Sequence, residues 1–325
     1  MTFEVALARC GSYDPAAVAA AVEEAVAPFG GFSAFAGRGD RVLLKLNLLA
    51  AKAPEDAVTT HPALVREVIK RVQDCGAEVL VGDSPGGRNT PAKYRALLKK
   101  TGILDVIESS GARAVYFDDP VTTVASEKAR TFKKFTVTSV VHDVDAVIAL
   151  PKCKTHQFTT YTGAVKLLYG YIPGVRKAEY HLHAGRDVAW FAELLLDLCK
   201  TFPPALTIMD AVVGMDGPGP QSGTPRPIGL ILAGTNAPAI DFVATQVLGL
   251  DPASVPTVRI AAERGYGPAS LGEVTVHGPH PDTVRVEGFV PPVIRTMDRR
   301  LPPVIVPVLD RLLATRPAVD TGRCV

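Results

Sequence analysis

Short apolar, β-branched runs alternate with amphipathic segments along the first half of the chain. The runs predict strands at 3–8, 41–46, 78–82, 113–117 and 145–150, and the segments between them predict helices at 15–26, 62–75 and 91–100. Strands separated by helices are typical of right-handed βαβ units. We therefore expect an α/β fold with a mainly parallel, doubly wound sheet and helices on both faces.

The second half of the chain is less regular. Residues 151–186 are polar, glycine-bearing and rich in histidine and lysine, and no regular element is predicted there; a long helix is expected at 187–201. A strand at 206–209, a glycine–proline loop to 227, a strand at 228–233, helices at 238–248 and 256–264 and a strand at 273–276 follow. We expect one α/β domain over 1–290, with a split into two subdomains near 151–205 left open. Residues 291–325 are expected to form a proline-rich arm.

Composition narrows the class of protein. The 325 residues are 47% hydrophobic and 21% charged, which excludes a disordered chain. A net charge of +2 argues against nucleic acid or a membrane surface as a partner. No apolar run approaches the roughly 18 residues of a membrane span, and the N-terminus lacks a secretory signal, so we expect a cytoplasmic protein. A homodimer is left open.

The five cysteines are odd in number and far apart. They are Cys10, Cys75, Cys153, Cys199 and Cys324. No two are separated by just two residues, so neither a disulfide framework nor a complete zinc or iron–sulfur motif is predicted.

Polar residues follow four of the predicted strands. Ligands of open α/β sheets bind beyond the carboxyl ends of parallel strands, so these residues are expected at one rim. The candidate substrate-binding residues are Lys45, Asn47, His61, Asp83, Ser84, Gly86, Lys152, Lys154, Asp210, Asp216, Gly217 and Gly219.

Each of these positions also has a structural interpretation. Lys45 could extend to the surface, and residues 82–87 could form an ordinary strand-to-helix turn. Thr59 or Thr60 could cap the helix that begins near Pro62. For Asp241, in the first turn of the helix at 238–248, we favour the structural interpretation.

The segment 151–186 carries the sharpest chemical signal. Six lysines and arginines lie there with Glu179 as the only acid, and three of the seven histidines of the chain are interspersed. Cations beside histidines indicate an anionic substrate and proton transfer. The candidate catalytic residues are His156, Lys166, His181 and His183. On an extended segment the last two would point the same way, so a metal site with His156 stays open.

The order of these motifs resembles the domain of unknown function 362 family. The resemblance covers about residues 3–320 and rests on six elements: Leu44–Asn47, Thr59–Pro62, Gly82–Gly87, Pro151–His156, Gly163–Lys166 and Asp216–Pro220, with the histidines at 181 and 183. Many members of that family continue into a bacterial ferredoxin module. The resemblance therefore implies redox chemistry with an iron–sulfur electron donor, either attached or separate.

The printed chain departs from that pattern at its end. Cys324 resembles the first ligand of a ferredoxin motif, yet the later cysteines of the C-x₂-C-x₂-C-x₃-C-P run do not follow it. We interpret Cys324 as an orphaned cluster ligand, and a cluster is expected only with a downstream module. No other cofactor is predicted.

The sequence is consistent with three functions. The favoured one is a cytoplasmic enzyme that acts on a small anionic substrate by redox chemistry. The first alternative is a non-redox isomerase or racemase that transfers protons through lysine and histidine, with or without a metal. The second is a non-catalytic module that binds an anion.

Overall fold

A mixed sheet forms the centre of the computed structural model, which describes residues 2–185 and 187–294. Its strand order is β12-β1-β11-β10-β7-β2-β3-β4. The bounds are β1 (Phe3–Arg9), β2 (Arg41–Leu46), β3 (Glu78–Asp83), β4 (Arg113–Tyr116), β7 (Ala146–Leu150), β10 (Leu206–Asp216), β11 (Thr224–Gly234) and β12 (Val274–His277). Neighbours in this order pair in parallel, except that β11 runs against both β1 and β10. The expected α/β class with a mainly parallel sheet is confirmed.

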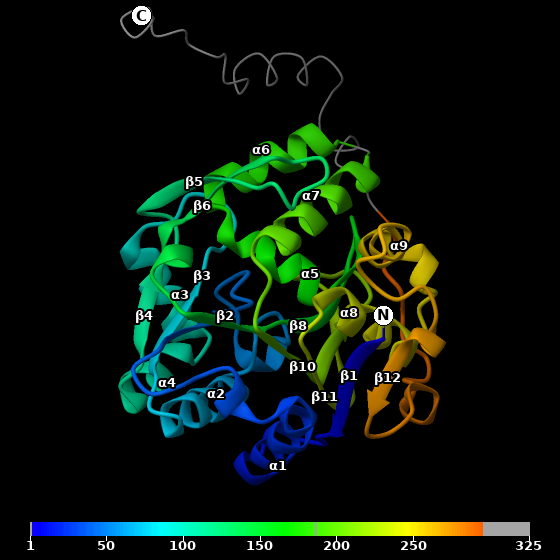
Figure 1. Cartoon of the computed structure of the whole chain (residues 1–325), viewed down its shortest axis with the longest axis horizontal. Helices are drawn as coiled ribbons and strands as arrows, with labels where there is room; N and C mark the ends of the chain where they lie inside the picture. The colour runs from blue at the N-terminus through cyan, green and yellow to red at the C-terminus, as the bar shows by residue number, and fades with distance from the viewer. Residues whose placement is uncertain (1, 186, 295–325) are drawn as a thin grey trace, which may run out of the picture.

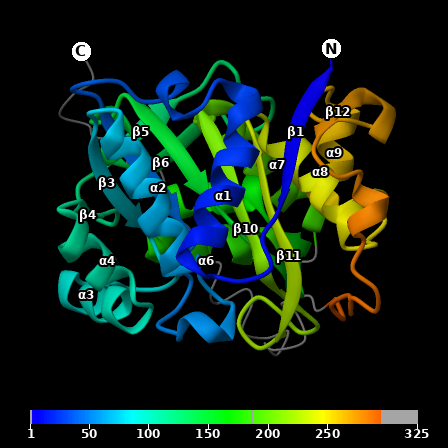
Figure 2. The same ribbon diagram turned by 90° about the horizontal axis from the view of Figure 1, so that it is seen from below.

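Helices cover both faces of the sheet (Figures 1 and 2). One core cluster joins one face to α1 (Pro15–Val26), α2 (Pro62–Asp74), α3 (Pro91–Lys100) and α4 (Ile103–Ser110). A second cluster joins the other face to α5 (Ala164–Leu167), α7 (Val188–Thr201), α8 (Ala237–Val247) and α9 (Pro256–Glu263). The doubly wound arrangement is the one that alternating strands and helices predict.

The helix starts follow local chemistry. Proline occupies the first position of α1, α2 and α3, where its missing N–H costs no hydrogen bond. Asp14 and Thr90 cap α1 and α3 through their side-chain oxygens. The cap of α2 is His61, whose Nδ1 accepts from the Ala63 amide at 3.2 Å, so neither Thr59 nor Thr60 has the capping role considered for them.

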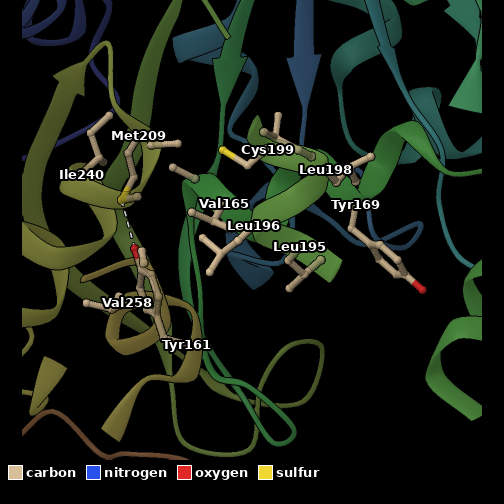
Figure 3. Close-up of a cluster of buried hydrophobic side chains, with 14 of the residues drawn as sticks. Tyr161, Val165, Tyr169, Leu195, Leu196, Leu198, Cys199, Met209, Ile240 and Val258 are labelled. Carbon is tan, nitrogen blue, oxygen red and sulfur yellow. Dashed lines mark hydrogen bonds between the residues drawn. The ribbon is translucent and has the colours of Figure 1, made fainter. Parts of the chain in front are cut away.

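Helix α7 is buried in the middle of the second cluster. Figure 3 shows Leu195, Leu196 and Leu198 of α7 near Val165 of α5. At the left of the same view the Tyr161 hydroxyl donates to the Met209 sulfur at 3.4 Å, which gives the buried phenol a polar partner. This packing fixes α5 against the sheet.

The segment 151–186, for which the sequence predicted no regular element, forms strands and helices. It contains β8 (Lys152–His156), β9 (Thr160–Thr162), α5 and the longer helix α6 (Gly174–Ala184). Strand β8 pairs in parallel with β10 and antiparallel with β9. The error arose because polar residues were taken for exposed ones, whereas Lys152, Lys154 and Thr155 are buried.

The predicted loop at 210–227 is also mostly regular. Strand β10 runs on to Asp216 and β11 begins at Thr224, so the two form a long hairpin with a bulge between Ala211 and Val213. Two further elements were not expected, namely α4 and the hairpin of β5 (Val121–Ala125) with β6 (Lys134–Thr138).

Two expectations concern the chain as a whole. The division at residue 290 stays a prediction, because most of the expected arm lies outside the described residues. Over residues 2–185 and 187–294, no helix has the length and apolar character needed to cross a bilayer.

Gly82 provides a test of the packing beneath the strand ends. A Cβ at this position would lie 2.3 Å from Phe117 Cε1 and 2.8 Å from Val115 Cγ2. We predict that Gly82→Ala lowers the free energy of unfolding by about 1–3 kcal/mol, as overpacked core sites do. The matched control is Gly86→Ala, because nothing lies within 4 Å of a Cβ there. Equal urea midpoints for the two variants would contradict the prediction.

Candidate active site

A cleft of about 500 Å³ opens where β2, β3 and β8 end. Helices α5 and α6 supply further walls. The next strand after β2, β3, lies on one side of it, and β7 lies on the other side of β2. The cleft therefore lies at a topological switch point of the sheet. The cleft is lined by seven of the sequence-predicted site residues: Asn47, Asp83, Ser84, Gly86, His156, Lys166 and His181.

Lys45 and Asp83 form a buried ion pair where β2 and β3 end. Lys45 Nζ donates to Asp83 Oδ1 at 2.7 Å and to the Leu46 carbonyl at 2.9 Å. The second carboxylate oxygen accepts from the Leu48 amide at 2.6 Å. Burial lowers the pKa of Lys45, and the Asp83 carboxylate opposes that shift. The predicted ligand Lys45 is therefore a partner of Asp83 and does not line the cleft.

Asp118 fixes the loop after β3 through hydrogen bonds. This carboxylate accepts from the Ser84 hydroxyl, from Asn89 Nδ2 at 3.0 Å and from the Gly174 amide at 3.2 Å. A Cβ on Gly174 would lie 2.3 Å from the Gly87 carbonyl oxygen, so only glycine lets α6 begin this close to the loop. The turn and α6 form one unit.

Lys166 is the cleft cation without a partner. Among the described residues no hydrogen bond or ion pair reaches its Nζ, and burial alone lowers its pKa to about 8. Its helix α5 is fixed by Asp241, which accepts from the Ala164 amide at 2.6 Å and the Val165 amide at 3.0 Å. Asp241 is structural, but not for the expected reason: the first turn of α8 holds no acidic residue, and Asp241 acts on the helix that carries Lys166.

Lys177 is a cleft residue that the sequence reading did not select. It lies on α6, its Nζ donates to the Ser84 carbonyl, and it lies 5.9 Å from the centre of the Tyr169 ring. Burial lowers its pKa to about 7. The signal that could have found it was the lysine-rich segment itself, read as a helix with Lys177 and His181 four residues apart.

His156 faces the cleft as a neutral donor. Its Nδ1 accepts from the amides of Phe158 and Thr159 at 3.1 and 3.3 Å, which leaves the proton of the neutral ring on Nε2. Burial and the nearby Lys166 charge hold its pKa well below the usual range. It is therefore suited to hydrogen-bond a ligand oxygen rather than to accept a proton.

The other two predicted histidines lie on different sides of helix α6. His181 lines the cleft and stacks on Phe191 with the ring centres 4.5 Å apart, and burial lowers its pKa to about 3. His183 is exposed on α6. Residues two apart on a helix diverge, so the expectation of a shared direction was wrong. Within the described ranges, no three His, Cys, Asp or Glu side chains are grouped to hold a metal ion.

A second polar cluster contains three other predicted ligands. Lys152 Nζ donates to Asp210 Oδ2 at 2.9 Å and to the Tyr13 hydroxyl at 2.7 Å, and that hydroxyl donates to Asp210 Oδ1. The His61 amide also donates to Asp210, while its ring stacks on Tyr13 at 3.5 Å. Both side chains of the ion pair are fully buried. Lys152, Asp210 and His61 therefore form an internal network and do not line the cleft.

The remaining predicted ligands also lie outside the cleft lining. Buried Lys154 donates to the Val58 carbonyl at 2.6 Å, and burial holds its pKa well below the usual range. Asp216 accepts from the Val290 amide and Gly217 donates to the Val290 carbonyl. Gly219 packs on Thr155 and leads to Pro220, which does line the cleft. Cys324 lies outside the described residues.

The chain is an α/β protein with a cleft where strands of its mainly parallel sheet end. Residues 42–246 match the family model described as Domain of unknown function (DUF362), and the chain belongs to this family, as its motifs led us to expect. A thylakoid-associated protein of Synechocystis sp. is 34% identical over 306 residues, which cover 94% of this chain and 93% of the relative.

Two solved structures share a distant likeness. The lactate racemase apoprotein from Thermoanaerobacterium thermosaccharolyticum has a TM-score of 0.45 and 14% identity, covering 74% of this chain and 57% of that one. A structural-genomics crystal structure of a Thermotoga maritima protein has a TM-score of 0.39 and 11% identity, covering 77% and 59%. The chain thus spans less than two thirds of both.

The internal network gives a stability prediction. Lys152→Met leaves the Asp210 carboxylate buried without a cation, and we expect unfolding free energy to fall by about 3–5 kcal/mol. The double variant Lys152→Met with Asp210→Leu removes both charges, and should recover most of that loss. Urea denaturation of the three proteins measures the difference. A double variant as unstable as the single one would contradict the assignment.

Proposed function

We propose that the cleft binds a small organic acid and moves a proton at a carbon next to a carboxylate or carbonyl group. The observation that supports this most directly is the Lys166 ammonium, which lines the cleft and has no hydrogen-bond or ion-pair partner among residues 2–185 and 187–294. An uncompensated cation in a partly desolvated site favours an anion. With a pKa of about 8, roughly one-tenth of Lys166 is neutral at pH 7 and able to accept a proton.

The proposed step uses two groups with different duties. The ammonium form of Lys166 binds the anion, and only its minor neutral form takes the proton. In that form a C–H bond breaks, an N–H bond forms and the electron pair moves onto the adjacent oxygen as an enolate, which the new ammonium then faces. The Nε2–H of His156 is in the correct form to donate to that oxygen. Return of the proton from Lys166 regenerates the acid or its isomer. This step corresponds to the isomerase or racemase that the sequence analysis gave as its first alternative, in the form that uses no metal.

Two other functions of the same cleft stay proposals. Redox chemistry with an iron–sulfur donor is supported by the family resemblance, and a requirement for reduced ferredoxin would favour it. A non-catalytic anion-binding module would bind carboxylates tightly and exchange no hydrogen. A cytoplasmic location and a homodimer also stay predictions.

Anion binding should depend on pH through Lys166. Lys166 is charged below a pKa of about 8, so binding of propionate and 3-phenylpropionate should be strong at about pH 6 and weaken as the pH rises through about 8. The matched control is Lys166→Arg, because arginine stays charged above pH 12. Titration calorimetry of the variant should show binding that persists to about pH 10. Parallel losses in both proteins would assign the titration to another group.

Proton transfer should be separable from binding in the same variant. In D₂O, the wild-type protein should speed deuterium incorporation into the methylene group of phenylpyruvate, as followed by NMR. Arginine cannot give up its proton at these pH values, so Lys166→Arg should still bind phenylpyruvate yet lose at least about 100-fold in exchange rate. Equal exchange rates in the two proteins would exclude Lys166 as the proton acceptor.

A further inference from the structure

One wall of the cleft is aromatic and uncharged. Phe158, Tyr169 and His181 line the cleft, and all three rings pack on Phe191 behind them, with centres 5.5, 5.2 and 4.5 Å from its own. We call these three side chains the aromatic wall. The Tyr169 hydroxyl donates to the Lys177 carbonyl at 2.8 Å, so its polar end is already satisfied inside the protein. The wall is a rigid surface that suits a flat apolar group.

The polar lining offers a ligand little free charge. Asp83 lines the cleft, and its charge is balanced by Lys45 at 2.7 Å. The Lys177 amine donates to the Ser84 carbonyl and lies over the Tyr169 ring, and burial lowers its pKa to about 7, so it is mostly neutral at about pH 7.5. Lys166 is therefore the cation left to a ligand among the described lining residues. One free cation matches one carboxylate, whereas a second ligand anion would be desolvated without a partner.

The size of the cleft sets a lower limit on the ligand. Its 500 Å³ falls within the range of about 300–1,000 Å³ of pockets that enclose ligands of drug size. An acid of three carbons would leave most of that space filled by water against the aromatic wall. Apolar surface that stays wet contributes no binding free energy.

We infer that the preferred ligands are aromatic monocarboxylic acids, with the carboxylate at Lys166 and the ring against Phe158, Tyr169 and His181. This inference rests on the proposed function, because it names the substrate class of the same cleft. The aromatic wall provides the selectivity and Lys166 provides the anchor.

The test is a calorimetric titration of the full chain with matched probes at about pH 7.5, where Lys166 is mostly charged and Lys177 mostly neutral. 3-Phenylpropionate should bind at least about tenfold more tightly than propionate, because the ring is desolvated against the wall. Phenylsuccinate and the neutral 3-phenylpropionamide should each bind at least about tenfold more weakly than 3-phenylpropionate. Equal affinities for propionate and 3-phenylpropionate, or tightest binding of phenylsuccinate, would overturn the inference.

A variant of the wall makes the test specific. Phe158→Leu removes the ring but keeps the site apolar, and it should reduce the preference for 3-phenylpropionate over propionate by about threefold to tenfold. The control is Arg176→Gln on the exposed side of α6, which should leave the preference unchanged. A similar reduction in both variants would contradict a role for the wall. If no carboxylate binds the wild-type protein, the proposed function itself fails, an outcome distinct from loss of ring preference.

Discussion

The ammonium of Lys45 and the carboxylate of Asp83 lie 2.7 Å apart and are both buried. Such a pair is tolerable only with further hydrogen bonds, and the Leu46 carbonyl and the Leu48 amide supply two of them. The pair thereby fixes the ends of β2 and β3 relative to each other. It also fixes the chain above, because a Cβ on Gly170 would lie 2.2 Å from Asp83 Oδ1. The segment between α5 and α6 can approach only as glycine, so both cleft helices depend on this pair.

The lysines of the chain divide into internal and ligand-facing groups. Lys45 and Lys152 are neutralised by buried aspartates, and Lys154 is held by a backbone carbonyl. Lys177 donates to the Ser84 carbonyl, and no partner among the described residues neutralises Lys166. Internal partners thus offset the cost of burying the other lysines. The positive potential in the cleft then comes mainly from one ammonium. A cleft with a single free charge orients a ligand more sharply than a diffuse basic surface.

The sheet and most helices could be predicted because their signals are local. Apolar runs gave β2, β3 and β7 nearly to the residue, and proline at the first turn gave α1, α2 and α3. The segment 151–186 failed because β8 reads Lys-Cys-Lys-Thr-His, and pattern reasoning places lysine outside. The strand-end rule predicted that Asn47, Asp83 and His156 meet at one rim, and all three line the cleft. It could not separate them from Lys152 and Asp210, because those two side chains pair with each other inside the protein and this pairing is not visible in the sequence.

Helix α6 presents Gly174, Lys177, Ala178 and His181 to the cleft, spaced three, four and seven residues from the first. These positions form a single stripe of one helix, while the opposite stripe, including Val175 and Arg176, is exposed. Gly174 is fixed as glycine by its contact with Gly87, but substitutions at the other three positions change the surface of the cleft without disturbing strand register or the buried ion pairs. Related proteins that keep this frame are therefore free to diverge in the molecules they recognise through a handful of codons, and sequence identity across the sheet says little about shared substrates.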